Sequence, residues 1–256
     1  SQAYRNYWRE GLLEPSSREQ SEARLEDRLS DLLFLEYGKR VRGEDLFTSL
    51  RQAYRENGLG FFDSPDPPLR DLFLWRSEEQ RRYTVRLTDG PIDLEVRFLD
   101  GLLLQGWKDF ASLGLATTTG WVENGLLYCL DWAYDRDSEN FQVSYLQHEA
   151  RHLADLQRWP GLDSTELEYR AKLTELAFAN RSMRRVLDDF SSKAAQNPAS
   201  PHAMANWRVV NDLYMGVFGR EMPVGFENWG ELRSWKVRRV ARRLLEESSR
   251  RIEEQA

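Results

Sequence analysis

The sequence predicts an α+β protein that is mainly helical, with a small, largely antiparallel sheet packed against one helix. Three observations support this fold class. Apolar residues recur at helical spacing over residues 3–58 and again from residue 141 to the C-terminus. Between residues 82 and 134 they alternate with polar residues, which is typical of half-buried strands. An H-E-x-x-H sequence at residues 148–152 follows these strands, in the helix against which we expect the sheet to pack.

The composition excludes several classes of protein. Apolar residues make up 41% of the chain and aromatic residues 12%, which suffices for a hydrophobic core and excludes a fully disordered chain. The net charge of −6 argues against a general nucleic-acid binder. No apolar run approaches the roughly 20 residues of a membrane span. The single cysteine, Cys129, excludes an internal disulfide and a cysteine-based metal cluster.

We therefore expect a soluble protein without a transmembrane segment. The first residue is Ser1 rather than methionine, and no signal peptide is recognisable. This start is compatible with a mature exported protein, periplasmic or secreted, and equally with a chain trimmed of its leader. The sequence does not decide between these compartments.

The N-terminal part of the chain is expected to contain two long helices. Ser16 and Glu19 match the S-x-x-E capping box at the start of a leucine-rich helix. A second helix is expected over residues 44–57, with Gly58 at its C-terminal end. We interpret these helices as a packing unit, and in one alternative they bind a protein partner.

Residues 60–68, with the sequence GFFDSPDPP, mark the expected domain boundary. Their three prolines predict a linker or an ordered loop. We therefore divide the chain into a helical N-terminal subdomain at 1–68 and a second domain at 69–256, whose C-terminal part is also helical.

The strands of the second domain are expected to pair as two hairpins. The first spans residues 83–98 around an Asp-Gly turn, and the second spans residues 117–134 around an Asn-Gly turn. These two dipeptides are the strongest short-range signals for a hairpin. A short helix at 69–75 precedes the strands, and a short strand at 102–104 lies between the hairpins.

Four helices are expected after the sheet. Their expected spans are 141–158, about 164–193, 201–218, and about 228 to the C-terminus. Ser138 or Asn140 caps the first helix. Trp159 ends it, because the residue before a proline avoids the α region.

The later helices have start signals of their own. Asp163 and Glu166 form a capping box, and Pro201 stands at a first helical position, where proline is favoured. Asn228 and Glu231 open the last helix. We interpret its dense run of arginines and glutamates as a solvated face with i,i+4 pairs.

His148, Glu149 and His152 form the H-E-x-x-H sequence. On a helix, residues i and i+4 lie on one face. Two imidazoles so placed can both reach one tetrahedral Zn²⁺, and the glutamate beside the first can reach its bound water. The whole chain has three histidines, and two of them are here. In the alternative interpretation both are ordinary helix histidines beside an ion-paired glutamate.

A zinc hydrolase needs a third protein ligand and an open position for water. No histidine follows within the next 40 residues, so we expect a carboxylate from the next helix. Glu168 fits best, because it lies about one turn, or about 5 Å, into that helix. Glu175 lies about 15 Å in and would overshoot unless the helices cross steeply. Asp155 is a further alternative.

With these residues the sequence resembles the gluzincin metallopeptidases, a group of the zincins. In many of them the third ligand lies in a Ser-x-x-x-Glu-x-x-Ala-Asp segment, which residues 164–172 match except that Lys172 replaces the Asp. That Asp supports a ligating histidine in the family, so Asp155 or Glu175 would have to substitute for it here. Lys172 also allows Glu168 a different role, as one member of a surface ion pair.

The resemblance covers residues 117–176 and implies a zincin-like metallopeptidase domain. It implies a Zn²⁺ cofactor and a peptide or protein substrate, with Glu149 as general base. In the family an extended substrate lies against an edge strand, here residues 126–134. A further donor should stabilise the oxyanion. We select His202, since it lies in the first turn of a helix whose dipole favours the neutral imidazole. Tyr214 and Tyr169 are the alternatives.

Two other functions are compatible with the sequence. One is a non-catalytic zincin-like scaffold or interaction protein, and the other is a zinc hydrolase of a non-peptide substrate. The intact Glu149 favours a catalytic role over a scaffold. The motif itself does not distinguish a peptide bond from another hydrolysable bond.

Overall fold

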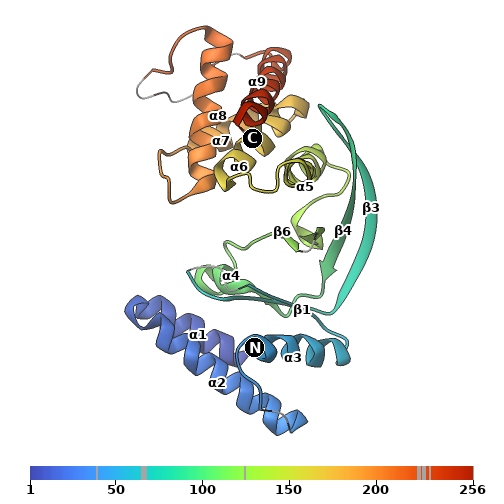
Figure 1. Ribbon diagram of the computed structural model, residues 1–256, viewed down its shortest axis with the longest axis vertical. Helices are drawn as coiled ribbons and strands as arrows, with labels where there is room; N and C mark the ends of the chain where they lie inside the picture. The colour runs from blue at the N-terminus through green and yellow to red at the C-terminus, as the bar shows by residue number, and fades with distance from the viewer. Residues whose placement is uncertain are drawn as a thin grey trace. The chain divides into compact units, whose positions relative to one another are not determined.

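The computed structural model describes residues 1–38, 40–64, 68–123, 125–223, 226, 229–230 and 232–255 (Figure 1). Within these ranges the chain is mainly helical, with strands in two small sheets, so the predicted α+β fold class is confirmed. Contacts divide the chain into two units, Ser1–Arg81 with Val96–Ala133 and Arg82–Glu95 with Tyr134–Ala256. Residue 68, our expected boundary, lies inside the first unit. None of the described helices has a stretch long and apolar enough to cross a lipid bilayer.

The first unit begins with three helices, α1 (Gln2–Leu13), α2 (Arg18–Tyr37) and α3 (Glu44–Glu56). The expected helices are therefore present. The capping box assigned to Ser16 lies outside the described side chains, and Ser17 is the residue before the first turn of α2. α2 ends at Gly38, whose positive φ of 68° suits a residue without a side chain. The apolar faces of the helices join strand residues in one core around the fully buried Trp8.

A three-stranded antiparallel sheet packs on these helices. It consists of β1 (Gly60–Ser64), β2 (Asp71–Trp75) and β5 (Leu104–Gln105), in the order β1-β2-β5. The prediction of a linker or loop from residue 60 was therefore wrong for Gly60–Ser64, which form β1. The prediction of a short helix at 69–75 was wrong for Asp71–Trp75, which form β2. Pro65, Asp66 and Pro67, the centre of the expected loop, lie outside the described residues.

Burial on both faces explains the error at β2. Leu72 and Leu74 point into the core with the helices, while Phe73 and Trp75 belong to a second hydrophobic cluster. A strand that is apolar on both sides loses the alternation of period two, and its short run cannot be told from a helix by periodicity. Strand pairing, which depends on distant residues, decides between the two.

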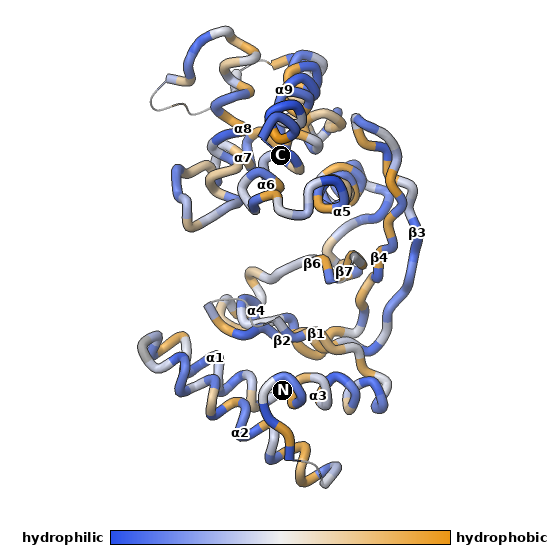
Figure 2. Tube along the Cα trace, viewed as in Figure 1, coloured by the Kyte–Doolittle hydropathy of each residue, from blue (hydrophilic) through white to orange (hydrophobic). Residues whose placement is uncertain are grey.

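The second sheet has four strands, in the order β3-β4-β7-β6. They are β3 (Ser77–Leu87), β4 (Gly90–Asp100), β6 (Gly120–Glu123) and β7 (Leu126–Leu130), and the boundaries of the two units fall within β3 and β4. In Figure 2 orange and blue alternate along β4, as expected for one buried face. The β6–β7 hairpin is antiparallel, but β4 pairs with β7 in parallel. β7 thus lies between two strands, and the edge strand expected at 126–134 was wrong.

The second unit is built around helix α6 (Ser164–Phe178). Every residue of α6 from Glu168 to Ala177 is buried, so the helix has no solvent-facing stripe. Its neighbours are α5 (His148–Arg158), α7 (Met183–Ser192), α8 (Pro201–Phe218) and α9 (Ser234–Gln255). Asn228 and Glu231, the expected start of α9, lie outside the described residues.

The single helix expected at 164–193 is divided into α6 and α7, which corrects that prediction. The carboxylate of Glu139 accepts hydrogen bonds from the backbone N–H groups of Asn180 and Arg181 and from the hydroxyl of Ser182. These donors lie in the connection between α6 and α7, directly before the first residue of α7, Met183. Glu139 therefore fixes the turn that separates the two helices, a contact that a local sequence pattern does not reveal.

Glu139 should contribute stability that depends on pH. Burial raises the pKa of Glu139, but the hydrogen bonds from Asn180, Arg181 and Ser182 outweigh it and hold this pKa below the usual range. A carboxyl group whose pKa is lowered by folding stabilises the folded state at neutral pH and loses that contribution as the pH falls through the folded-state pKa. Glu139→Gln should thus lower the free energy of unfolding by about 1 kcal/mol at pH 7.

Urea unfolding followed by circular dichroism at a series of pH values measures this difference. Glu221→Gln, at an exposed position, is the matched control and should leave the free energy unchanged. A Glu139→Gln loss that stayed constant down to the acid limit of folding would contradict a contribution from the charged form of Glu139.

Candidate metal centre

The H-E-x-x-H segment is preceded by a π-helix, Phe141–Gln147, which runs directly into α5. The Oγ atom of Ser138 accepts a hydrogen bond from the N–H of Phe141 at 3.1 Å, so Ser138 rather than Asn140 caps the segment. The rings of Phe141 and Tyr145 stack at 5.5 Å within it. We expected one regular helix over 141–158. Such π-helical segments are rare and often occur at functional sites.

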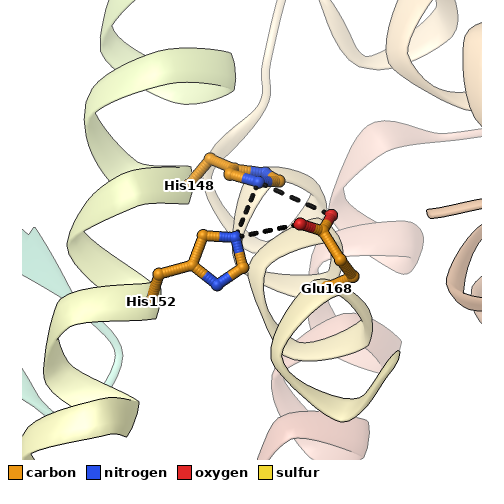
Figure 3. A group of neighbouring side chains, drawn as sticks. All are labelled: His148, His152 and Glu168. Carbon is orange, nitrogen blue, oxygen red and sulfur yellow. Dashed lines mark hydrogen bonds and ion pairs between the residues drawn. The ribbon is translucent and has the colours of Figure 1, made fainter. Parts of the chain in front are cut away.

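His148 and His152 on α5 and Glu168 on α6 converge on one point (Figure 3). The Nε2 atoms of the two histidines are 3.0 Å apart. Oε1 of Glu168 lies 3.2 Å from Nε2 of His152, and Oε2 lies 3.7 Å from Nε2 of His148. Both histidines are half-buried and Glu168 is buried. The structure thus brings together the three residues that the sequence proposed as ligands.

Glu168 is held as a carboxylate by surrounding nitrogen atoms. Nδ1 of His202 lies 2.9 Å and Nζ of Lys172 lies 3.4 Å from its Oε2 atom. Burial raises the pKa of Glu168, but the hydrogen bonds from His152 and His202 and the charges of His148 and Lys172 outweigh it and lower this pKa far below the usual range. The ion pair with Lys172 is therefore present, and it is buried rather than a surface pair.

Glu175 contacts the opposite side of the His148 ring. Its Oε1 atom lies 2.8 Å from Nδ1 of His148, and its side chain is almost fully buried. A carboxylate there holds the proton on Nδ1 and leaves the lone pair of Nε2 for a metal. Burial lowers the pKa of His148, but the hydrogen bond and charge of Glu175, with the charges of Glu149 and Glu168, raise it overall. Glu175 thus occupies the position of a residue that orients a ligand.

Asp155, the other alternative ligand, binds two arginines instead. Its carboxylate accepts hydrogen bonds from Nε and Nη2 of Arg170 at 2.8 and 3.0 Å and lies 2.8 Å from Nη2 of Arg151. Arg151 also binds Asp89, and Arg170 binds Ser248 on α9. All of Asp155, Arg151 and Arg170 are buried. This network fixes α5 against α6 and α9.

Glu166 does not complete the capping box in which we placed it. Asp163 caps α6 by accepting hydrogen bonds from the N–H groups of Thr165 and Glu166 at 2.9 and 3.1 Å. The carboxylate of Glu166 turns inward and accepts hydrogen bonds from Ser248 at 2.7 Å and Arg208 at 2.7 Å. It therefore belongs to the support of α6.

The three candidates for the oxyanion donor lie in different surroundings. His202, in the first turn of α8, is next to Glu168, and 71% of its side chain is exposed. Tyr214 is buried in the hydrophobic core, where its ring packs against Trp229 and Phe226. The hydroxyl of Tyr169 donates to Asp212 at 2.9 Å. Of the three, only His202 has a contact with the His148–His152–Glu168 cluster among those that the structure describes.

The donor set fits a zinc ion in chemistry and in size. Two imidazoles and one carboxylate with open space for water are typical of a catalytic zinc site. Ligand bonds of about 2.0–2.1 Å in a tetrahedron place the ligand atoms about 3.3 Å from one another. The observed separations of 3.0, 3.2 and 3.7 Å lie around that value.

Comparisons with models of known protein families, with curated proteins and with solved structures give no match to this chain. The resemblance to the gluzincins therefore stays a prediction that depends on the sequence of residues 117–176 alone.

Removal of Arg170 tests the network that supports the centre. Arg170→Met should lower the free energy of unfolding by about 3 kcal/mol or more, because it leaves Asp155 buried without its bidentate partner. Arg243→Met is the control, since the pair of Arg243 with Glu247 is half-exposed and worth less than about 1 kcal/mol. Chemical unfolding measures both values. Similar losses for the two variants would show that the buried network does not stabilise the fold more than a surface pair.

Glu175→Gln tests the orienting role of Glu175. The variant should bind Zn²⁺ about 10–100-fold more weakly, the loss typical of removing the partner of a ligating histidine. Competition with a fluorescent chelator measures the affinity, with Glu168→Gln and the His148→Ala/His152→Ala variant beside it. A loss in Glu175→Gln as large as in Glu168→Gln would make Glu175 a ligand. An unchanged zinc affinity in Glu175→Gln would exclude Glu175 both as a ligand and as the residue that orients His148.

Proposed function

We propose that the protein is a zinc-dependent metallopeptidase in which His148, His152 and Glu168 bind Zn²⁺ and Glu149 is the general base. The observation that carries the proposal is the convergence of one donor atom from each of the three ligands within 4.8 Å of one another. A further carboxylate, Glu175, on the far side of His148 supports the same assignment.

Zn²⁺ is the ion that best suits these ligands. Imidazole and carboxylate together are typical of catalytic zinc sites, while Ca²⁺ and Mg²⁺ prefer sites made of oxygen atoms alone. When bound, zinc lowers the pKa of a water molecule to about 7 and polarises a carbonyl group. The described part of the chain offers two nitrogen ligands and one oxygen ligand, which leaves a fourth position open.

The residues around the ligands have distinct roles in this proposal. Glu149 directly follows a ligand on α5, and its charge acts on His148. It takes a proton from the attacking water and returns it to the leaving amine. His202 is half a helix turn into α8, is largely exposed and lies beside Glu168, so it can reach a bound substrate. We assign the role of hydrogen-bond donor to the oxyanion to the side chain of His202. Tyr214 is a poorer candidate, because its ring is enclosed in the hydrophobic core.

The choice of a peptide substrate rests on the resemblance of residues 148–172 to the gluzincins. A zinc hydrolase of another bond and a non-catalytic zinc scaffold use the same three ligands. The decisive feature is the function of Glu149, because a scaffold has no use for a base next to its metal.

Replacing Glu149 separates an enzyme from a scaffold. A carboxamide is nearly isosteric with the carboxylate but cannot accept the proton of the water. Glu149→Gln should therefore keep its zinc and its fold. Its rate of peptide hydrolysis should fall by a factor of about 100 or more, the loss typical of removing a general base. The measurement is cleavage of a broad peptide library by mass spectrometry, with zinc content determined on the same samples.

Glu246→Gln on the exposed side of α9 is the matched control and should be as active as the parent protein. Equal activity in Glu149→Gln and the parent would exclude Glu149 as the base. A zinc-loaded parent protein that cleaves no peptide but hydrolyses esters or other amides would reassign the substrate. No hydrolysis of any of these bonds would favour the scaffold.

A further inference from the structure

A pocket of about 250 Å³ lies within the first unit, and none of the residues of the metal centre lines it. It is lined by residues of α3 and by strand residues from both sheets. Four of the lining residues are arginines and two are glutamates: Arg51, Arg55, Arg76, Arg97, Glu78 and Glu123. In a chain with a net charge of −6, this is a local excess of positive charge.

The two carboxylates of the pocket are already paired. Oε1 of Glu123 lies 3.4 Å from Nη2 of Arg51. Oε1 of Glu78 lies 2.7 Å from Nη1 of Arg97, and its Oε2 atom accepts a hydrogen bond from the indole of Trp75 at 3.1 Å. Two charges of the four guanidinium groups are thereby balanced within the pocket.

Arg55 and Arg76 supply the remaining charge. Both side chains are exposed, and neither forms an ion pair with any carboxylate in the described ranges. The stem of Arg76 packs against Gly101, whose added Cβ would lie 3.0 Å from it. The pocket therefore holds about two positive charges more than its own acids balance.

Helix α3 places two of these charges on one face. Arg51 and Arg55 are four residues apart, and like charges at this spacing repel each other and destabilise a helix. The Nε atom of Arg51 is also buried without a hydrogen-bond acceptor. A buried donor without a partner is costly, and an anion in the pocket would offset both features.

The lining of the pocket also includes two aromatic residues. Trp75 and Tyr128 both line it, with ring centroids 6.2 Å apart, and Tyr128 is buried. Gly60 allows the indole of Trp75 to lie directly on the backbone, since an added Cβ would lie 1.9 Å from the ring. The lining of the pocket therefore combines guanidinium groups with the edges of two largely buried aromatic rings.

We propose that this pocket binds a phosphate group. Guanidinium groups bind phosphate through paired hydrogen bonds, and a phosphate monoester carries about −1.5 to −2 charges at pH 7, which matches the excess of two positive charges. The bound group is either inorganic phosphate or the phosphate of a small monoester whose organic part lies beside Trp75 and Tyr128.

Isothermal titration calorimetry on the full chain tests the proposal, at constant ionic strength set with NaCl. Inorganic phosphate and phenyl phosphate are the two probes, and each should bind at one site per chain. Tighter binding of phenyl phosphate assigns an organic phosphate, and equal affinity assigns free phosphate. The arginine site is supported in either case.

The variant Arg55→Gln/Arg76→Gln should bind both probes about tenfold more weakly or worse, because it removes charge-assisted hydrogen bonds. Arg55→Lys/Arg76→Lys keeps both positive charges and should lose less affinity for the two probes than the glutamine variant. Arg9→Gln, at an exposed position on α1, is the control and should bind like the parent. The thermal midpoints of all variants check that they fold. No saturable binding at millimolar concentrations, or equal losses in Arg9→Gln and the double variant, would overturn the proposal.

Discussion

The buried ion pair between Asp155 and Arg170 is the interaction on which the candidate metal centre depends. Asp155 lies three residues after His152 on α5, and Arg170 lies two residues after Glu168 on α6. Two nearly parallel hydrogen bonds join the pair, and such a bidentate contact fixes orientation as well as distance. The separation between the histidines of one helix and the glutamate of the other follows from this contact.

Helix α6 shows how the fold accommodates buried charge. A charged group is stable in a protein interior only when it is paired and hydrogen-bonded. Glu166 has Ser248 and Arg208, Arg170 has Asp155, and Glu168 has Lys172 and His202. The helix therefore has polar contacts with α5, α8 and α9 at once, and its remaining buried residues fill the core between them.

The features that the sequence could predict are those encoded by residues close together in the chain. The i,i+4 spacing of His148 and His152 predicted their shared face, and Asp163 predicted the start of α6. The choice of Glu168 followed from helix length alone. In each case the relevant partner lies within about one turn of a helix or across one short connection.

The features that the sequence could not predict depend on distant residues or on small changes of backbone geometry. Glu139 lies 41 residues from the backbone N–H group of Asn180, from which it accepts a hydrogen bond. The strand β2 is defined by partners on both sides and has no alternating pattern of its own. The π-helix differs from an α-helix only in hydrogen-bond register, for which Phe141–Gln147 carry no known signal. Glu175 appeared too distant as a ligand, and its place behind His148 became evident only from the crossing of the helices.

The contacts of α9 also have a consequence for the biosynthesis of the protein. Ser248 and Ser249, near the end of the chain, bind Arg170, and Arg251 binds Glu166. These partners are translated about 80 residues after the residues of α6 that they bind, so α6 cannot complete its polar contacts until α9 has been synthesised. Domains generally fold as units, the N-terminal ones first, during synthesis. The residues of the first unit end at Ala133 and are therefore all synthesised before α6, whereas the second unit gains its full set of contacts only once α9 has been synthesised.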